Sequence, residues 1–207
     1  NPEYGVTFTY YVKDKIKTLK QKRQDAEKAL KKDGKDVFYP SLEEMHAEDH
    51  EEKPYLMFII KDASGIAVRK IKTGQKKGIN RISWNFRHAS TSPIRLSYGK
   101  PGRYSMSDDG PLALPGDYTV ELWRVHGTEL NQIAAPSKFT IKPLNNQTLL
   151  AKDKKALLEF QNQVAELRRS VDGSSKLMGE ISSRLKHIKA ATQQYPSVPL
   201  EMATQVS

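Results

Sequence analysis

The stretch from Tyr55 to Arg87 constrains the fold most, because its apolar residues form first a continuous run and then a strict alternation. Residues 56–60 are apolar without interruption, which predicts a buried central strand. Two turns that each contain a glycine divide the rest of the stretch. After the second turn, Ile82, Trp84 and Phe86 alternate with polar residues, as on a half-buried strand. We therefore predict three strands here, with the Trp84 side chain in the core.

Strand signals also occur outside this stretch. Residues 4–12 and 117–125 alternate between apolar and polar side chains, and a short final strand is expected around Phe139 and Ile141. Six or seven short strands in two clusters are typical of an all-β sandwich. The prediction is a mainly β protein with some α structure. Its main domain, over residues 1–143, is an Ig-like or fibronectin-III-like antiparallel β-sandwich.

Residues 13–53 are predicted to be a helical and acidic insertion in this sandwich, between the strands at 4–12 and 55–61. Apolar residues recur at helical spacing up to Gly34, with Arg23 interrupting the stripe. Ser41 and Glu44 stand in the positions of a capping box, which predicts a second, brief helix. Acidic residues follow it, and we expect them to pair with the basic first helix.

A C-terminal αα-hairpin is predicted over residues 144–195, followed by a Pro-punctuated tail at 196–207. Apolar residues from Leu150 to Thr192 mostly follow the three-and-four spacing of a heptad. The sequence Asp172-Gly173-Ser174 interrupts this pattern and is expected to separate two helices. The apolar stripe must be covered by the hairpin itself, by the first helix or by a partner.

The formal net charge of +10 raises nucleic acid or an anionic surface as partners. The segment from Lys13 to Lys32 contains nine Lys or Arg residues and three acids. No aromatic platform or recognition motif accompanies it, so we favour a solvated helix face over nucleic-acid binding. The absence of cysteine excludes disulfides and thiolate metal sites. No apolar run is long enough to predict a membrane span.

Four short motifs resemble a known pattern: D-x-x-G at 62–65, V-R at 68–69, W-N at 84–85 and P-G-D-Y at 115–118. Together they are similar to the Ig-like domain of flagellar hook-capping proteins, in which the Trp is a core residue. The wider arrangement, including the opening residues 1–12, resembles the C-terminal region of secreted bacterial sortilin-like β-propeller proteins, often labelled glycosyl hydrolases. The resemblance covers residues 1–12 and 54–143, and the insertion departs from it.

This resemblance implies an extracytoplasmic location and an upstream β-propeller of the same polypeptide as the partner. Any hydrolase chemistry would then belong to the propeller. The chain opens at Asn1 without a Met or a signal peptide, and we accordingly expect it to be a piece of a longer polypeptide.

Few residues have the spacing of a catalytic or metal site. His46 and His50 are four apart and could share a metal on a helix, but Ala47 stands where the zincin pattern has Glu, and a third ligand is missing. Asp108-Asp109-Gly110 fits a plain turn better than a calcium site. We predict no catalytic residues, no metal and no cofactor.

The sequence therefore predicts a non-catalytic C-terminal accessory module of a larger secreted protein, acting by packing, spacing or protein–protein contact. The alternative is a carbohydrate-binding module attached to a glycoside hydrolase. That alternative depends on Trp123, which falls on the strand face opposite Tyr118 and Leu122, and on the long irregular segment 88–114. An exposed Trp there could stack on a sugar ring.

Overall fold

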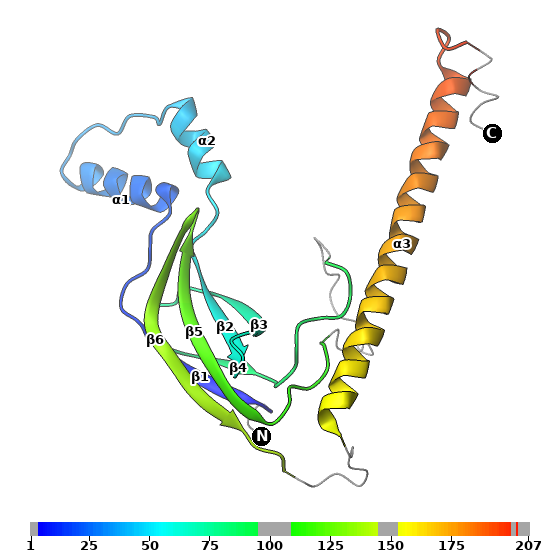
Figure 1. The fold of residues 1–207 in the computed structure, drawn as a ribbon. Coiled ribbons are helices and arrows are strands. Elements are labelled where there is room, and N and C mark those ends of the chain that lie inside the picture. The colour runs from blue at the N-terminus through cyan, green and yellow to red at the C-terminus, as the bar shows by residue number, and fades with distance from the viewer. Residues whose placement is uncertain (1–3, 95–108, 145–152, 200–201, 203–207) are drawn as a thin grey trace. The chain divides into compact units, whose positions relative to one another are not determined.

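The computed structural model describes residues 4–94, 109–144, 153–199 and 202. The chain divides into two units, one made of residues 1–89 with 112–150 and the other of residues 90–111 with 151–207. Each unit is described separately below. The first contains all six strands of the described chain and two short helices, and the second contains one long helix (Figure 1).

The strands form two antiparallel sheets. The larger sheet has four strands in the order β3-β2-β5-β6, and the smaller pairs β1 with β4. The predicted central strand is confirmed, because β2 lies between β3 and β5. The strands are β1 (Val6–Val12), β2 (Tyr55–Asp62), β3 (Ala67–Gly74), β4 (Gly78–Trp84), β5 (Gly116–His126) and β6 (Glu129–Ile141).

Both sheets contribute to one hydrophobic core. Trp84 of β4 is 1% exposed, which confirms its predicted place, and its ring lies 5.8 Å from that of Tyr118 on β5. Phe8 of β1 stacks on Phe58 of β2 at 6.1 Å. Although residues 56–60 are all apolar, only every second side chain of β2 is fully buried, because the outer face of its sheet is half-exposed.

Backbone details hold Trp84 in place. Its indole Nε1 donates a hydrogen bond to the carbonyl of Arg87 at 2.8 Å. Gly5, at a φ of +135°, passes so close to Trp84 that a Cβ would lie 2.0 Å from the Trp84 carbonyl oxygen. A larger residue at position 5 would therefore separate the start of β1 from the end of β4.

The strands that flank the predicted insertion, β1 and β2, belong to different sheets and meet through core side chains. One detail of the strands differs from the sequence prediction. The last strand begins at Glu129 and not near Phe139. Its first half, ELNQIAA, lacks a regular alternation and is mostly exposed along the sheet edge, and its pairing with β5 shifts register around Leu122. The first half of β6 therefore lacks the apolar–polar alternation that predicts a strand, although it is paired with β5.

The predicted insertion contains two helices, α1 (Leu19–Lys32) and α2 (Leu42–His50). The capping box at Ser41 and Glu44 is confirmed, and Thr18 with Gln21 forms a second one at the start of α1. Neither helix buries a residue, so polar contacts rather than apolar packing hold these helices.

In the second unit, α3 runs from Lys154 to Gln194 as one continuous helix of 41 residues. The predicted αα-hairpin is therefore wrong. Gly173 and Ser174 weaken a helix by about 1 kcal/mol or less each, which does not end it when no proline follows. Arg168 and Asp172, one turn apart at 3.5 Å, also pair in the turn that leads into the expected break. Among the described residues, no helix is long and apolar enough to cross a membrane.

Candidate functional site

Among the described residues, one face of α3 exposes a long stripe of large apolar side chains. The helix begins at Asp153, whose carboxylate accepts hydrogen bonds from the backbone N–H groups of Lys155 and Ala156 at 2.9 and 3.0 Å. From Leu157 onward, mostly apolar residues recur at spacings of three and four in turn, which places them on one stripe of the helix. We call this stripe the seam, and it comprises Leu157, Phe160, Val164, Leu167, Val171, Ser174, Met178, Ile181, Leu185 and Ile188.

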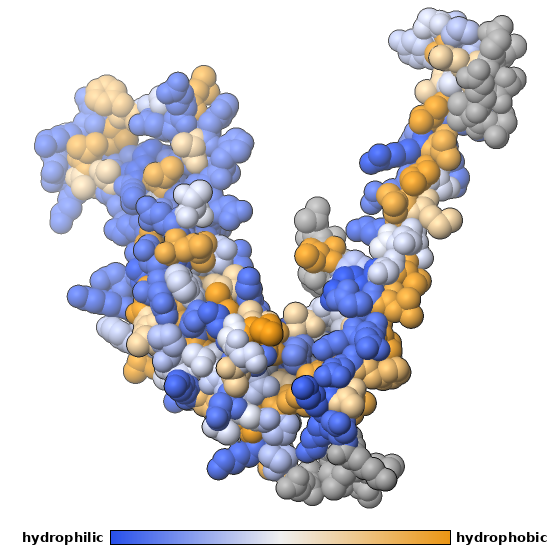
Figure 2. Space-filling view, viewed as in Figure 1, coloured by the Kyte–Doolittle hydropathy of each residue, from blue (hydrophilic) through white to orange (hydrophobic). Residues whose placement is uncertain are grey.

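The seam occupies the a and d positions of consecutive heptads, with Leu157 at a and Phe160 at d. Its apolar side chains are between 44% and 71% exposed. Figure 2 shows apolar side chains along the length of α3. A soluble helix normally buries such a stripe, and the described residues leave this one open.

Another part of the helix is better covered. Ala165, at the b position of its heptad, is 9% exposed, and Leu158, one heptad earlier, is half-buried. In the same unit, Ser92 is also buried. Burial along α3 is therefore greatest off the seam.

Charge is distributed unevenly around the seam. The flanking e and g positions from 154 to 191 hold Lys154, Arg168, Arg184 and Lys189 and no acidic residue. The acids of the helix lie farther from the seam, at the b and c positions, and are Glu159, Glu166, Asp172 and Glu180. The seam is therefore an apolar stripe with cationic borders.

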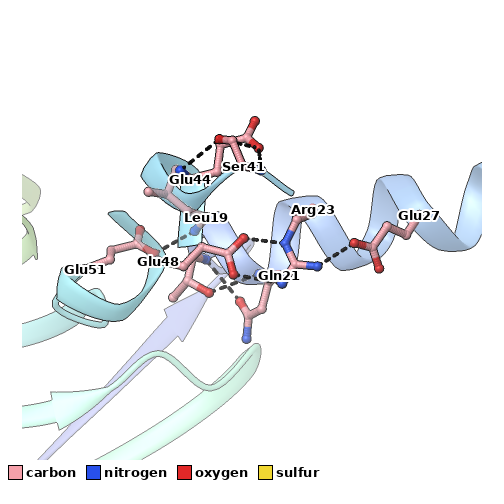
Figure 3. A network of polar contacts seen from close by, with 9 residues as sticks. Leu19, Gln21, Arg23, Glu27, Ser41, Glu44, Glu48 and Glu51 are labelled. Atoms are coloured by element: carbon pink, nitrogen blue, oxygen red, sulfur yellow. Dashed lines mark hydrogen bonds and ion pairs between the residues drawn. The ribbon is translucent and has the colours of Figure 1, made fainter. Parts of the chain in front are cut away.

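In the first unit, a cluster of polar side chains joins α1 to α2. Arg23 donates to Glu48 through Nε at 2.5 Å and Nη2 at 2.8 Å, and its Nη1 contacts Glu27 (Figure 3). The Glu48 side chain is 8% exposed. The Arg23 hydrogen bond holds the pKa of the Glu48 carboxyl below its usual range. The predicted pairing of the basic helix with the acidic run is thus confirmed at Arg23.

The Glu51 carboxylate connects α1 and α2 to β5 of the larger sheet. One carboxylate oxygen accepts from the backbone N–H of Leu19 at 2.6 Å, and the other lies 3.1 Å from Nε2 of His126 at the end of β5. Because Leu19 is the first residue of α1, its N–H has no partner within the helix. One carboxylate therefore joins α1, the residue after α2, and β5.

The helical pair also borders a shallow hollow of about 290 Å³, lined by residues that include Arg23, Phe38 and Glu48. Phe38 and Tyr39, on the connection between the helices, are 86% and 85% exposed. Three of the charged side chains at the hollow, Arg23, Glu27 and Glu48, already bind one another and are therefore less available to recognise a small molecule.

His46 and His50 lie on α2, as the spacing predicted, with ring centroids 6.3 Å apart. The His50 Nδ1 donates to the carbonyl of His46 at 2.8 Å, which leaves its Nε2 for other contacts. Within the described ranges, no group of three or more potential metal-ligating side chains is assembled. The pair is therefore brought together without the third ligand that a metal site requires.

Trp123 lies on the outer face of the four-stranded sheet, opposite Met57 of β2. It is half-buried, and its indole Nε1 donates to Glu121 at 3.0 Å. Lys61 contacts the same carboxylate at 2.6 Å and, together with Trp123, lowers the Glu121 pKa. The ring is thus restrained by a polar pair, and its N–H is already used.

The calcium candidate Asp108-Asp109-Gly110 lies partly outside the described residues, because Asp108 is not among them. The irregular segment 88–114 is described only at its ends. There Arg87 forms an isolated antiparallel bridge with Leu112, and Ala113 donates to Phe86 at 2.7 Å.

Comparison with known proteins identifies no relative: no protein family, curated protein or solved structure matches this chain.

The heptad spacing predicted the seam but placed it on two helices, whereas α3 is one helix. The roles of Arg23 and Glu51 were not predicted. Arg23 was visible as a charged residue in the apolar stripe of α1, and such an interruption indicates a specific polar partner. Glu51 had no comparable signal, because its partners are 32 and 75 residues away.

Proposed function

We propose that this chain is a non-catalytic accessory module of a larger secreted β-propeller protein and acts through protein–protein contact. The single observation that carries the contact role is the exposed seam of α3. Two β-sheets around one core give a stable body, and the helix supplies a surface for another molecule.

The size of the seam supports this function. From Leu157 to Ile188 it extends about 50 Å at 1.5 Å per residue, and a helix is about 10 Å wide. Burying it against a second helix would remove about 500 Å² on each side and about 1,000 Å² in total, which reaches the range of specific interfaces. Exposed apolar patches of this size on soluble proteins commonly mark interaction sites.

An Ig-like sandwich is the proposed form of the β-rich unit. In Ig domains, a Tyr near the start of a late strand donates its hydroxyl to the backbone a few residues upstream. The hydroxyl of Tyr118, the last residue of the P-G-D-Y motif, donates at 2.7 Å to the carbonyl of Leu114, the residue just before the motif. This bond and the core position of Trp84 support the resemblance to hook-capping Ig-like domains.

A seam-specific binding assay tests the contact role. The probe is a labelled five-heptad peptide with Leu at a and d and Gln at e and g, titrated by fluorescence anisotropy. The double variant Leu167→Asn/Ile181→Asn should lose binding by tenfold or more, because each Asn places a polar group in a buried layer. The matched variant Lys155→Asn/Lys176→Asn changes f positions and should bind like the parent. Equal loss in both variants would contradict a role for the seam.

The non-catalytic part of the proposal has its own test. The chain should show no turnover on a panel of glycosides and peptides. Robust turnover that disappears with one Asp, Glu or His substitution would overturn it. The proposed context is tested by the coding sequence upstream of Asn1, in which we expect β-propeller repeats.

A further inference from the structure

We infer that the partner of the seam is an α-helix of another protein, whose own heptad seam is bordered by Asp or Glu. This inference rests on the proposed contact function and specifies the chemistry of its partner. It follows from which charges lie at the positions that meet across a helix pair.

In a two-helix coiled coil, the e and g residues of one helix face those of the other and select its partner and orientation. On α3 the charged residues at these positions are Lys154, Arg168, Arg184 and Lys189, and all are cationic. Arg184 and Lys189 are exposed, and the Arg168 side chain is 59% exposed. These side chains are therefore positioned to contact a helix docked on the seam.

A second copy of the chain fits this surface poorly. In a parallel pair, each g residue meets the e residue five positions later, so Arg184 would face Lys189 of the other copy. In an antiparallel pair with the seams fully overlapped, e residues meet e residues, and Lys154 would face Lys189 of the other copy. Neither arrangement places an acid at a border position, and both place two cations together.

An acidic-bordered helix satisfies the same positions with opposite charges. Each exposed pair of this type favours binding slightly, and a like-charge pair disfavours it by a similar amount. Over the four cationic positions, these differences correspond to a preference of tenfold or more for acidic over basic borders. The seam provides affinity, and its borders decide between partners.

The test uses two synthetic five-heptad peptides with Leu and Ile at a and d. One has Glu at every e and g position, and the other has Lys there. The Glu peptide repels itself at neutral pH, so it serves as a monomeric probe. We expect the full chain to bind the Glu peptide at least tenfold more tightly than the Lys peptide in low salt, with the difference shrinking as salt screens the borders.

Matched charge reversals locate the effect. The variant Arg168→Glu/Arg184→Glu/Lys189→Glu should invert the preference toward the Lys peptide. The control Lys155→Glu/Lys176→Glu/Lys186→Glu changes the net charge equally at f and b positions, and should keep the parent's preference. If the first variant loses helix content by circular dichroism, Arg184→Glu/Lys189→Glu carries the same comparison with a smaller expected shift.

The outcomes separate this inference from the function on which it rests. Equal affinity for the two peptides would overturn the acidic-partner inference while leaving helix docking intact. Self-association of the chain through the seam at micromolar concentration, abolished by Leu167→Asn/Ile181→Asn, would also overturn it in favour of a second copy. Binding to neither peptide, without self-association, would overturn both proposals.

Discussion

At the scale of single residues, the stability of the first unit depends most on aromatic side chains shared by the two sheets. The Trp84 ring contacts both Tyr118 and Phe139. Its indole N–H is satisfied by the Arg87 carbonyl, so burial leaves no polar group without a partner. The second tryptophan, Trp123, lies on the outer face of the larger sheet and is only half-buried.

The two tryptophans should therefore respond differently to truncation. Trp84→Ala should lower the free energy of unfolding by about 3–5 kcal/mol, because it empties a fully buried site. Trp123→Ala should cost clearly less, because its side chain is only half-buried and its removal empties no enclosed site. Chemical denaturation of the two variants measures both values. A Trp84→Ala protein as stable as the parent would contradict the placement of this residue in the core.

A half-buried histidine, His88, gives the unit a dependence on mild acid. Burial lowers the pKa of His88, and the nearby Asp62 carboxylate opposes that shift. As the pH falls below the unfolded value of about 6.5, the unfolded chain takes up a proton that the folded chain resists. Stability from the neutral His88 is thus present above about pH 6.5 and is lost as the pH falls toward the folded pKa.

This pH effect is measured by comparing urea unfolding at pH 7.5 and pH 5.5. The parent should lose more stability between these values than His88→Gln does, because glutamine cannot be protonated. An equal loss in both proteins would show that His88 does not contribute to the acid sensitivity.

At the scale of elements, α1 and α2 depend on polar anchors. Neither helix has a buried residue, and Glu51 and the Arg23–Glu48 pair join them to each other and to β5. The stability of this helical pair should therefore be largely separable from that of the core.

Glu51→Ala should loosen the helical pair and leave the sheets nearly unchanged. Amide hydrogen exchange should rise across residues 19–50, because the N-terminus of α1 and its link to His126 are both lost. The neighbouring exposed residue provides a control, and Glu52→Ala should have little effect. If exchange instead rises equally in β2 and β5, the helices would have to be part of the same cooperative unit as the core.

The middle of α3 is weak for its length, because Gly173 and Gly179 lie within two turns of each other. An added Cβ at either position would meet nothing within 4 Å, and neither has a positive φ. Gly173→Ala/Gly179→Ala should therefore stabilise the helix by about 1 kcal/mol per site and increase far-UV circular dichroism. The reverse change, Ala190→Gly, should lower it. No gain in helicity would indicate that the glycines adopt another conformation in solution.

At the scale of the whole molecule, the core and the seam belong to separate units. Every member of the core cluster lies between Val6 and Ile141. A chain that ends at residue 150 should therefore keep cooperative thermal unfolding and the near-UV circular dichroism of its buried aromatic residues. Loss of both signals would show that α3 is needed for the core to fold.

Local patterns in the chain determined which segments form strands and helices. Alternation indicated β1, β4 and β5, a capping box indicated α2, and heptad spacing indicated the seam. Each of these features is encoded by residues that are close together in the sequence, so it can be recognised without tertiary structure. The candidate seam was thus accessible from the sequence, although its continuity was not.

Tertiary structure decided what depends on distant partners. It placed β1 and β2 in different sheets, extended β6 along β5 through exposed residues without apolar alternation, and made one helix of the predicted hairpin. It also gave Arg23 and Glu51 partners far away in the chain. Cross-strand hydrogen bonds and ion pairs depend on which groups meet in space, and a weak helical segment such as Gly173-Ser174 can be carried by the turns around it. Periodicity determined the elements, and long-range contacts determined their assembly.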